Sequence, residues 1–273
     1  KREEFLRRAR DYASLTIPSL FQDAGSSSNQ GQYQTPFQST GARGVNNLAS
    51  KLMLTLFPPS SPFFTIEPNQ ESVALIRSAG GDDTEVDRVR NEFAEYERLA
   101  LKRFESSNMR PALFQALQQL IVGGNTLVDW FDPETPRIVH LDSHAVDRDP
   151  MGVVRAIVIR ERVGVAFLPD DVRSQIALTE QDRASGDVDL WTWVRLTKDG
   201  KGYDMSQHAG QNGHLVPFSD RTFKKAELPF VPVAFRRQPH ECYGRGYVEL
   251  FFGSLISLEA LSQAIAEGTV AAA

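Results

Sequence analysis

The spacing of apolar residues changes near residue 124 of this chain. Before that point they recur every three or four residues, which is the spacing of one face of a helix. This spacing predicts helices to about Leu15, over 84–106 and over 110–122, with Thr84 as a cap and Pro111 in a first turn. The clearest run precedes Pro58 and Pro59 and comprises Val45, Leu48, Ala49, Leu52, Met53 and Leu56. The stretch NQESVALIRSAGGDD is either a short helix or a loop, and 23–32 has the composition of a flexible loop.

From residue 125 to residue 237 apolar and polar residues alternate instead, which is the pattern of half-buried strands. The predicted strands are NTLVDWF, RIVHL, VVRAIVIRERV, DLWTWVRLT, GYDMSQ and FVPVAFRR. KDGKG at 198–202 is a hairpin turn, and FLPDDVRSQIA adds a short helix. The segment 246–267 is again helical, with apolar density high enough that we expect both of its sides to be partly covered. Helices, then strands, then a long helix indicate an α+β fold.

Composition limits the classes of function. The chain has 273 residues, is 41% apolar and carries a formal net charge of −5. The length is enough for one large or two modest cores, and the negative charge argues against general phosphate binding over the whole surface. Cys242 is the single cysteine, so no internal disulfide is possible. No apolar run approaches the roughly 18 residues of a membrane span, and no signal peptide is visible. The chain lacks an initial Met and ends in TVAAA, so we expect it to be part of something longer.

The strongest candidate for chemistry is the stretch HLDSHAVDRD. If it forms a strand, His140, Asp142 and His144 point to one face, and Asp147 and Asp149 follow in a turn. Imidazole and carboxylate groups are good ligands for zinc and other divalent metals. The alternative interpretation is a polar strand end followed by an Asp-Pro turn. We favour the turn, because no HExxH helix accompanies these residues.

Three other candidates are weaker. Cys242 close to His240 resembles a thiol–imidazole pair, but such pairs are normally assembled from distant parts of a chain. The glycine motifs GARG and GRG lack the strand context and lysine of a phosphate loop. Arg236, Arg237 and Arg245 form a small basic cluster that faces either a nucleic-acid backbone, an acidic neighbour or solvent. The residues alone therefore predict a structural or assembly role more than an enzyme.

Several blocks of sequence resemble one family closely. TIPSLF at 16–21 and YQTPFQSTGARGVNNLASKLMLTLFPP at 33–59 resemble the N-terminal region of portal proteins, or head-to-tail connectors, of autographivirus-type podoviruses. The similarity continues in LFQALQQLIVGGNTLV at 113–128, in DRDPMGVV at 147–154 and in YGRGYVELFFGSLISLEALSQAIAE at 243–267. The blocks stand in the family's order over nearly the whole chain, whereas 164–228 is less similar.

The resemblance implies a ring, usually a dodecamer, at one vertex of the capsid in the virion. Double-stranded DNA would pass through it without sequence specificity during packaging and ejection. The implied partners are the terminase motor, tail adaptor and nozzle proteins, and the major capsid, scaffolding and internal core proteins. Assembly would take place in the host cytoplasm, with no membrane, no cofactor and no catalysis by this protein. Within the podovirus portal fold, we expect the wing region at 1–243, helical over 1–122 and β-rich over 125–237. The stem helix would start at 244–273, and the clip, second stem helix, channel loop and crown would lie outside this chain.

The family carries over no catalytic or metal residues, so the candidate sites are surfaces. The candidates for the DNA channel are Arg236, Arg237, Arg245, Glu249 and Gln263. The candidates for the subunit interface are Asn46, Asn47, Lys51, Phe251, Leu255 and Leu258. The remaining polar side chains of the last helix, such as that of Glu259, would face either the channel lumen or a neighbouring subunit. The helix that contains ARGVNNLASKLM is either an intersubunit element or part of the wing core. Two alternatives stay open: a metal-dependent hydrolase using His140, Asp142, His144 and Asp149, and a monomeric adaptor or tail protein.

Overall fold

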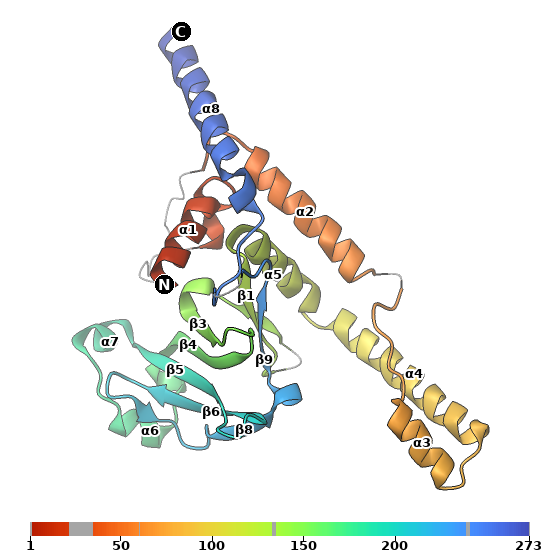
Figure 1. The fold of residues 1–273 in the computed structure, drawn as a ribbon. Coiled ribbons are helices and arrows are strands. Elements are labelled where there is room, and N and C mark those ends of the chain that lie inside the picture. The colour runs from red at the N-terminus through yellow and green to blue at the C-terminus, as the bar shows by residue number, and fades with distance from the viewer. Residues whose placement is uncertain (1, 22–34, 60, 133–134, 239–240, 273) are drawn as a thin grey trace.

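The fold is a body of two β-sheets and packed helices from which two helical elements project (Figure 1). The structure is a computed structural model that describes residues 2–21, 35–59, 61–132, 135–238 and 241–272. The predicted loop at 23–32 lies outside these ranges. In Figure 1 the last helix rises from one end of the body, and a helical arm extends from another side. The α+β class predicted from the sequence is confirmed.

The first part of the chain is helical. Its elements are α1 (Arg2–Ser14), α2 (Thr40–Leu56), α3 (Gln70–Ser78), α4 (Asp83–Ser106) and α5 (Met109–Gly123). The open question at 69–83 resolves as helix α3, where the Asn69 side chain caps the first turn by accepting from the Ser72 N–H at 2.7 Å. The cap predicted for α4 was wrong: Asp82, not Thr84, accepts from the N–H of Glu85.

Two antiparallel sheets follow. Sheet A has the order β2-β1-β9, and sheet B has the order β3-β4-β5-β6-β7, with β8 also paired to β6. The strands are β1 (Asn125–Asp129), β2 (Arg137–Val139), β3 (His144–Arg148), β4 (Val154–Gly164), β5 (Asp187–Leu196), β6 (Gly202–Ala209), β7 (His214–Leu215), β8 (Arg221–Lys224) and β9 (Phe230–Ala234). The hairpin at 198–202 and the short helix, α6 (Asp170–Gln175), are confirmed. The sequence interpretation missed β7, β8 and α7 (Glu180–Ser185).

The core divides at helix α5. On one side α5 packs against α1 and α2, where the buried residues include Ala9, Ala13 and Ala49. Small side chains at these positions let the helix backbones approach closely. On the other side a second cluster fills the space between the sheets, with Leu127, Ile157, Ile159 and Val194 almost fully buried. Helix α5 therefore joins the helical half to the β-rich half.

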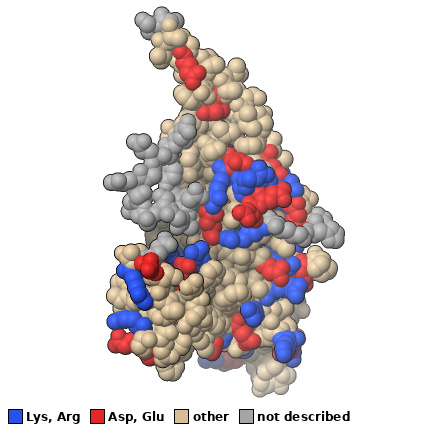
Figure 2. Space-filling view, turned by 90° about the vertical axis from the view of Figure 1, so that its left-hand side faces the viewer, with Lys and Arg blue, Asp and Glu red and all other residues tan. Residues whose placement is uncertain are grey.

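The last helix is the least covered element. After the 3₁₀ turn η5 (Val248–Phe251), α8 (Phe252–Ala272) leaves the body, and the exposed fractions of its side chains reach 62% at Leu261 and 80% at Val270. The prediction that both sides are partly covered was therefore wrong. Figure 2 shows this projection as mostly uncharged, with a few acidic side chains. By length and composition Val248–Ala271 is also apolar enough to cross a membrane. The sequence did not predict this, because serines and glutamates interrupt the apolar run.

Helices α3 and α4 form the projecting arm (Figure 1). Its surface keeps several exposed apolar side chains, including Leu75, Tyr96 and Leu99. Where the arm meets the body, aromatic rings pack against one another: Phe63 lies 5.3 Å from Phe57 and 5.0 Å from Phe104 between ring centroids. The arm is thus attached to the body through a cluster of phenylalanines at its base.

Candidate subunit interface and channel entrance

An apolar groove lies between α2 and the start of α8. Its volume is about 490 Å³. Five of the six residues predicted for the subunit interface line this one groove: Asn47, Lys51, Phe251, Leu255 and Leu258. They come from segments about 200 positions apart in the sequence, and the fold brings them together. Asn46 does not join them, because its side-chain oxygen accepts a hydrogen bond from Gln118 on α5 at 2.8 Å.

One end of the groove is held closed by a carboxylate. Glu259 on α8 accepts hydrogen bonds from the backbone N–H groups of Phe37 at 2.9 Å and Gln38 at 3.2 Å, just before α2 begins. The Gln38 side chain in turn accepts from the Gly41 N–H and donates to the Leu15 carbonyl. Within the subunit the Glu259 carboxylate therefore joins α8 to the segment before α2, a contact that the sequence analysis did not predict.

Glycines attach the last helix to the body. A Cβ atom on Gly246 would lie 2.2 Å from the carbonyl oxygen of Val122, and one on Gly124 would lie 2.4 Å from the backbone of Arg245. Gly124 also has φ +75°, in the left-handed region that favours glycine. The buried Asn125 side chain completes the contact by accepting from the Gly244 N–H and donating to the Gly244 carbonyl, both at 2.8 Å. The glycines of the YGRG motif are therefore required by close backbone packing.

One arginine of the predicted basic cluster, Arg245, is neutralised within the chain. Arg245 donates to both oxygens of Glu241, at 2.7 and 3.0 Å, and to Glu249 at 2.6 Å. The hydrogen bond with Glu241 is the main cause of a raised Arg245 pKa. Arg236 lies beside Arg245 in an antiparallel bridge, whereas the Arg237 guanidinium packs against Gly152. Glu241, Arg245 and Glu249 are spaced four residues apart, and this spacing in the sequence could have predicted the ion pairs.

The remaining channel candidates are placed differently. Glu249 stands on η5 and is occupied by Arg245, as described above. Gln263 lies on the exposed part of α8, where its amide donates to Glu267 at 2.8 Å. The five channel candidates therefore do not form one surface: four lie at the base of α8 or in the segment between β9 and η5, and Gln263 lies about three turns beyond the start of α8.

In the stretch HLDSHAVDRD the favoured interpretation, a strand end followed by an Asp-Pro turn, is confirmed, and the metal-binding strand is not formed. Leu141–Ser143 form a 3₁₀ turn in which Leu141 is buried, so His140, Asp142 and His144 do not alternate on one face of a strand. His144 is buried and bonds through Nδ1 to the His140 carbonyl at 2.9 Å, and Asp142 pairs with Arg10. Burial lowers the His144 pKa to about 4. Asp149 caps the following turn by accepting from the Val153 N–H.

Within the described ranges, no group of three His, Cys, Asp or Glu side chains is placed to hold a metal ion. The geometry thus gives the hydrolase alternative no support. The second weak candidate, the Cys242–His240 pair, falls partly outside the described residues, since His240 is not among them. Cys242 itself is partly buried, with its sulfur 3.9 Å from the Arg148 carbonyl oxygen.

Comparison with known sequences identifies the class of protein. The family described as "Bacteriophage head to tail connecting protein" matches residues 1–273, and the chain belongs to this family. The suspected resemblance is confirmed.

Particular relatives are named portal proteins. The chain is 35% identical over 271 residues to the portal protein of Escherichia phage T7, and 36% identical over 269 residues to that of Enterobacteria phage T3. The portal protein of Pseudomonas phage phiKMV is 32% identical over 260 residues. These alignments cover 97%, 97% and 94% of this chain but 49%, 49% and 50% of the relatives. The chain therefore spans about half the length of the curated relatives it matches.

Proposed function

We propose that this chain acts as part of a viral portal, a closed ring of identical subunits at one vertex of the capsid. The observation that carries this proposal is the family match over all 273 residues, together with relatives that are named portal proteins. The role is structural: the ring forms the passage for double-stranded DNA during packaging and ejection. In this reading the protein is a virion component assembled in the host cytoplasm.

The groove and the last helix support a ring. A closed ring of identical subunits needs two different, complementary patches on each subunit. One candidate patch is the groove lined by Leu255 and Leu258, and the second is the uncovered apolar surface of α8. Subunit interfaces combine an apolar centre with a polar rim, and here Asn47 and Lys51 are polar residues at the groove. We propose a dodecamer, as the resemblance implies.

The division into regions follows the projection of α8. Residues 1–243 would form the wing of a podovirus portal fold, and 244–273 the beginning of the stem helix. The glycine junction at Gly124, Gly244 and Gly246 would then be the attachment of stem to wing. The exposed apolar surface of α8 favours contact with neighbouring stem helices over a membrane span, because the same surface continues into the groove at Leu255.

A DNA passage should bind its cargo weakly. Each phosphate neutralised by a fixed cation adds affinity, so a strongly basic lumen would slow movement. A net charge of −5 and a basic cluster whose Arg245 is already paired with carboxylates are consistent with this requirement. At the channel entrance we propose Arg236 and Arg237 as the sparse cations. The proposed partners are the terminase motor, tail adaptor and nozzle proteins, and the major capsid, scaffolding and internal core proteins.

The test is the assembly state of the purified protein, by light scattering and electron microscopy of one fraction. Wild type should give rings with a central channel. Leu258→Glu places a charge in the groove and should give folded monomers, whereas Leu215→Glu on β7, an exposed leucine far from α8, should still give rings. Folded wild-type monomers at high concentration, or rings from the Leu258→Glu variant, would contradict the proposal.

A further inference from the structure

Sheet A leaves one of its strands uncovered. The strand order is β2-β1-β9, and helix α5 lies over β1 and β2. On the side that α5 covers, Thr126 and Val128 of β1 stand opposite Val233 and Val231 of β9. The two β1 side chains are buried, and the Thr126 hydroxyl donates to the Gln119 side chain of α5 at 3.1 Å. Val231 and Val233 are instead 43% and 37% exposed, because the helix does not extend over β9.

This open face continues through aromatic rings into the groove between α2 and α8. Phe235 lies on the same face as Val233, because side chains two residues apart share a face of an extended chain. Its ring centroid is 6.5 Å from that of Tyr247, which is 5.3 Å from that of Phe251. Tyr247 and Phe251 both line the groove. We define the β9 strip as Val231, Val233, Phe235, Tyr247 and Phe251.

The β9 strip is large for a surface that stays in water. Its three aromatic side chains are between 38% and 47% exposed. At roughly 200 Å² a ring, they leave about 250 Å² accessible, and the two valines extend this area. Contiguous apolar patches of several hundred Å² mark contact sites on soluble proteins. The strip therefore has the size and composition of the centre of an interface.

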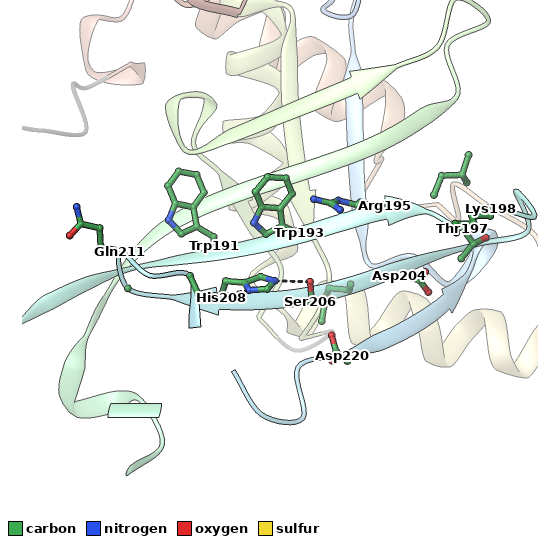
Figure 3. A pocket seen from close by; sticks show the side chains of 14 residues that line it. Trp191, Trp193, Arg195, Thr197, Lys198, Asp204, Ser206, His208, Gln211 and Asp220 are labelled. Atoms are coloured by element: carbon green, nitrogen blue, oxygen red, sulfur yellow. Dashed lines mark hydrogen bonds between the residues drawn. The ribbon is translucent and has the colours of Figure 1, made fainter. Parts of the chain in front are cut away.

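Sheet B shows how differently an open face is finished elsewhere in the chain. Trp191 and Trp193 stand on its outer face (Figure 3), and guanidinium groups cover both rings. Arg160 lies 5.5 Å from the centroid of Trp191, and Arg195 lies 4.8 Å from that of Trp193. Aromatic and charged side chains are thus mixed on sheet B, whereas the β9 strip contains no charged residue. Sheet B accordingly provides the control positions for the test below.

The edge of β9 determines how a partner can bind. Pro232 at the centre of this edge strand has no N–H, and its carbonyl already accepts from Arg148 at 2.8 Å. A strand from another chain would need that donor and that acceptor to extend the sheet. Strand addition is therefore blocked at this point, and a partner has to pack side chains on the face of the strip.

We propose that the β9 strip packs against a neighbouring copy of this chain, so that the subunit contact extends from the α2–α8 groove onto sheet A. The inference rests on the proposed ring. A second copy is the occupant because Tyr247 and Phe251 belong to both the strip and the groove, so a subunit that fills the groove also covers them. In a closed ring the neighbour contributes a different surface from its own strip. The wing would then share the ring contact with the stem helix.

The first test compares how strongly two glutamate variants weaken the ring. Val233→Glu places a charge at the middle of the strip, about as far from α8 as the strip extends. Mass photometry of a dilution series should show that this variant needs about tenfold more protein than wild type to form rings. Leu215→Glu is the matched control, since Leu215 is equally exposed but lies on sheet B. It should change that concentration by less than about twofold.

The second test needs no destabilising substitution. The photo-crosslinking amino acid p-benzoylphenylalanine replaces Phe235, and in a control protein it replaces Phe167, an exposed residue beside sheet B. Rings are assembled from equal amounts of ¹⁵N-labelled and unlabelled chains, irradiated and digested. Mass spectrometry should find peptide pairs of mixed isotope content from position 235, which only a contact between two copies can give. Position 167 should give few or none.

The outcomes separate this inference from the proposed function. Mixed-isotope pairs at position 235 together with weakened Val233→Glu rings would support the strip as a subunit contact. Wild-type rings with only single-isotope pairs at position 235 would overturn the inference and leave the ring intact. So would a folded Val233→Glu variant, checked by circular dichroism, whose rings are as stable as those of Leu215→Glu. Wild-type protein that forms no rings would contradict the ring itself and this inference with it.

Discussion

Adding one methyl group at Gly246 should weaken the attachment of the last helix strongly. The Cβ atom of Gly246→Ala would lie 2.2 Å from the Val122 carbonyl oxygen and 2.8 Å from that of Ile121. Both are backbone atoms at the end of α5 and cannot rotate away. Overpacking of a well-packed site costs about 1–3 kcal/mol. Moving the segment around Gly246 also disturbs the hydrogen bond from the Tyr247 N–H to the Ile121 carbonyl, 2.7 Å long, which adds about 1 kcal/mol.

The expected loss in the free energy of unfolding is therefore about 2–4 kcal/mol. Gly253→Ala provides the matched control. Gly253 lies on α8 with no atom within 4 Å of its added Cβ, and alanine is favoured over glycine in a helix by roughly 1 kcal/mol. Urea unfolding of both variants, followed by far-UV circular dichroism, measures the two effects. A Gly246→Ala variant as stable as Gly253→Ala would refute the argument from close packing.

Three further predictions concern single side chains. Folded His144 has a pKa of about 4 against 6.5 for the unfolded chain, so the unfolded state binds the proton first and stability falls as pH drops from 6.5 to 4. The loss in the free energy of unfolding is about 3 kcal/mol. Urea midpoints of His144→Gln measured across this pH range should lack this part of the pH dependence, and pH profiles identical to those of wild type would contradict the assignment. Asn125→Ala removes three buried hydrogen bonds from this side chain to backbone groups of Gly123 and Gly244. It should cost about 2–4 kcal/mol, read as a lower thermal midpoint, and an unchanged midpoint would count against the junction. Glu259→Gln should raise hydrogen exchange at the amides of Phe37 and Gln38, and protection equal to wild type would show that the carboxylate does not hold this end of the groove.

Local patterns carried most of the secondary structure. The long helices α4 and α5 begin and end within one or two residues of the predicted bounds, because helix periodicity and caps depend on neighbours in the sequence. The hairpin at 198–202 was equally local. The segment at 140–144 was left with two interpretations: the favoured strand end with an Asp-Pro turn is confirmed, but the 3₁₀ turn that contains the buried Leu141 was not predicted. A tertiary contact decided the local conformation there.

The sites depended on contacts that no local pattern contains. Asn125 and Gly244 are 119 residues apart, and Phe37 and Glu259 are 222 apart. The groove brings together most of the predicted interface residues. Their positions in the sequence, about 200 residues apart, do not show that they meet. For the arginine cluster the sequence left three partners open, and the structure supplies carboxylates of the same chain to Arg245, four residues to either side of it.

The arm of α3 and α4 amplifies small rotations. Helix α4 has 24 residues, which at 1.5 Å per residue is a rod of about 36 Å. Its base rests on the rings of Phe57, Phe63 and Phe104. Arg110 of α5 adds directed bonds at the same point, because it donates to the Glu105 carboxylate and to the Phe57 carbonyl, each at 2.8 Å. A rotation of about 10° at this base would carry the far end through about 6 Å, more than one helical turn. A displacement of about 6 Å at the tip of the arm therefore requires only a small rotation at its base, in which each phenylalanine ring moves by less than the width of the ring.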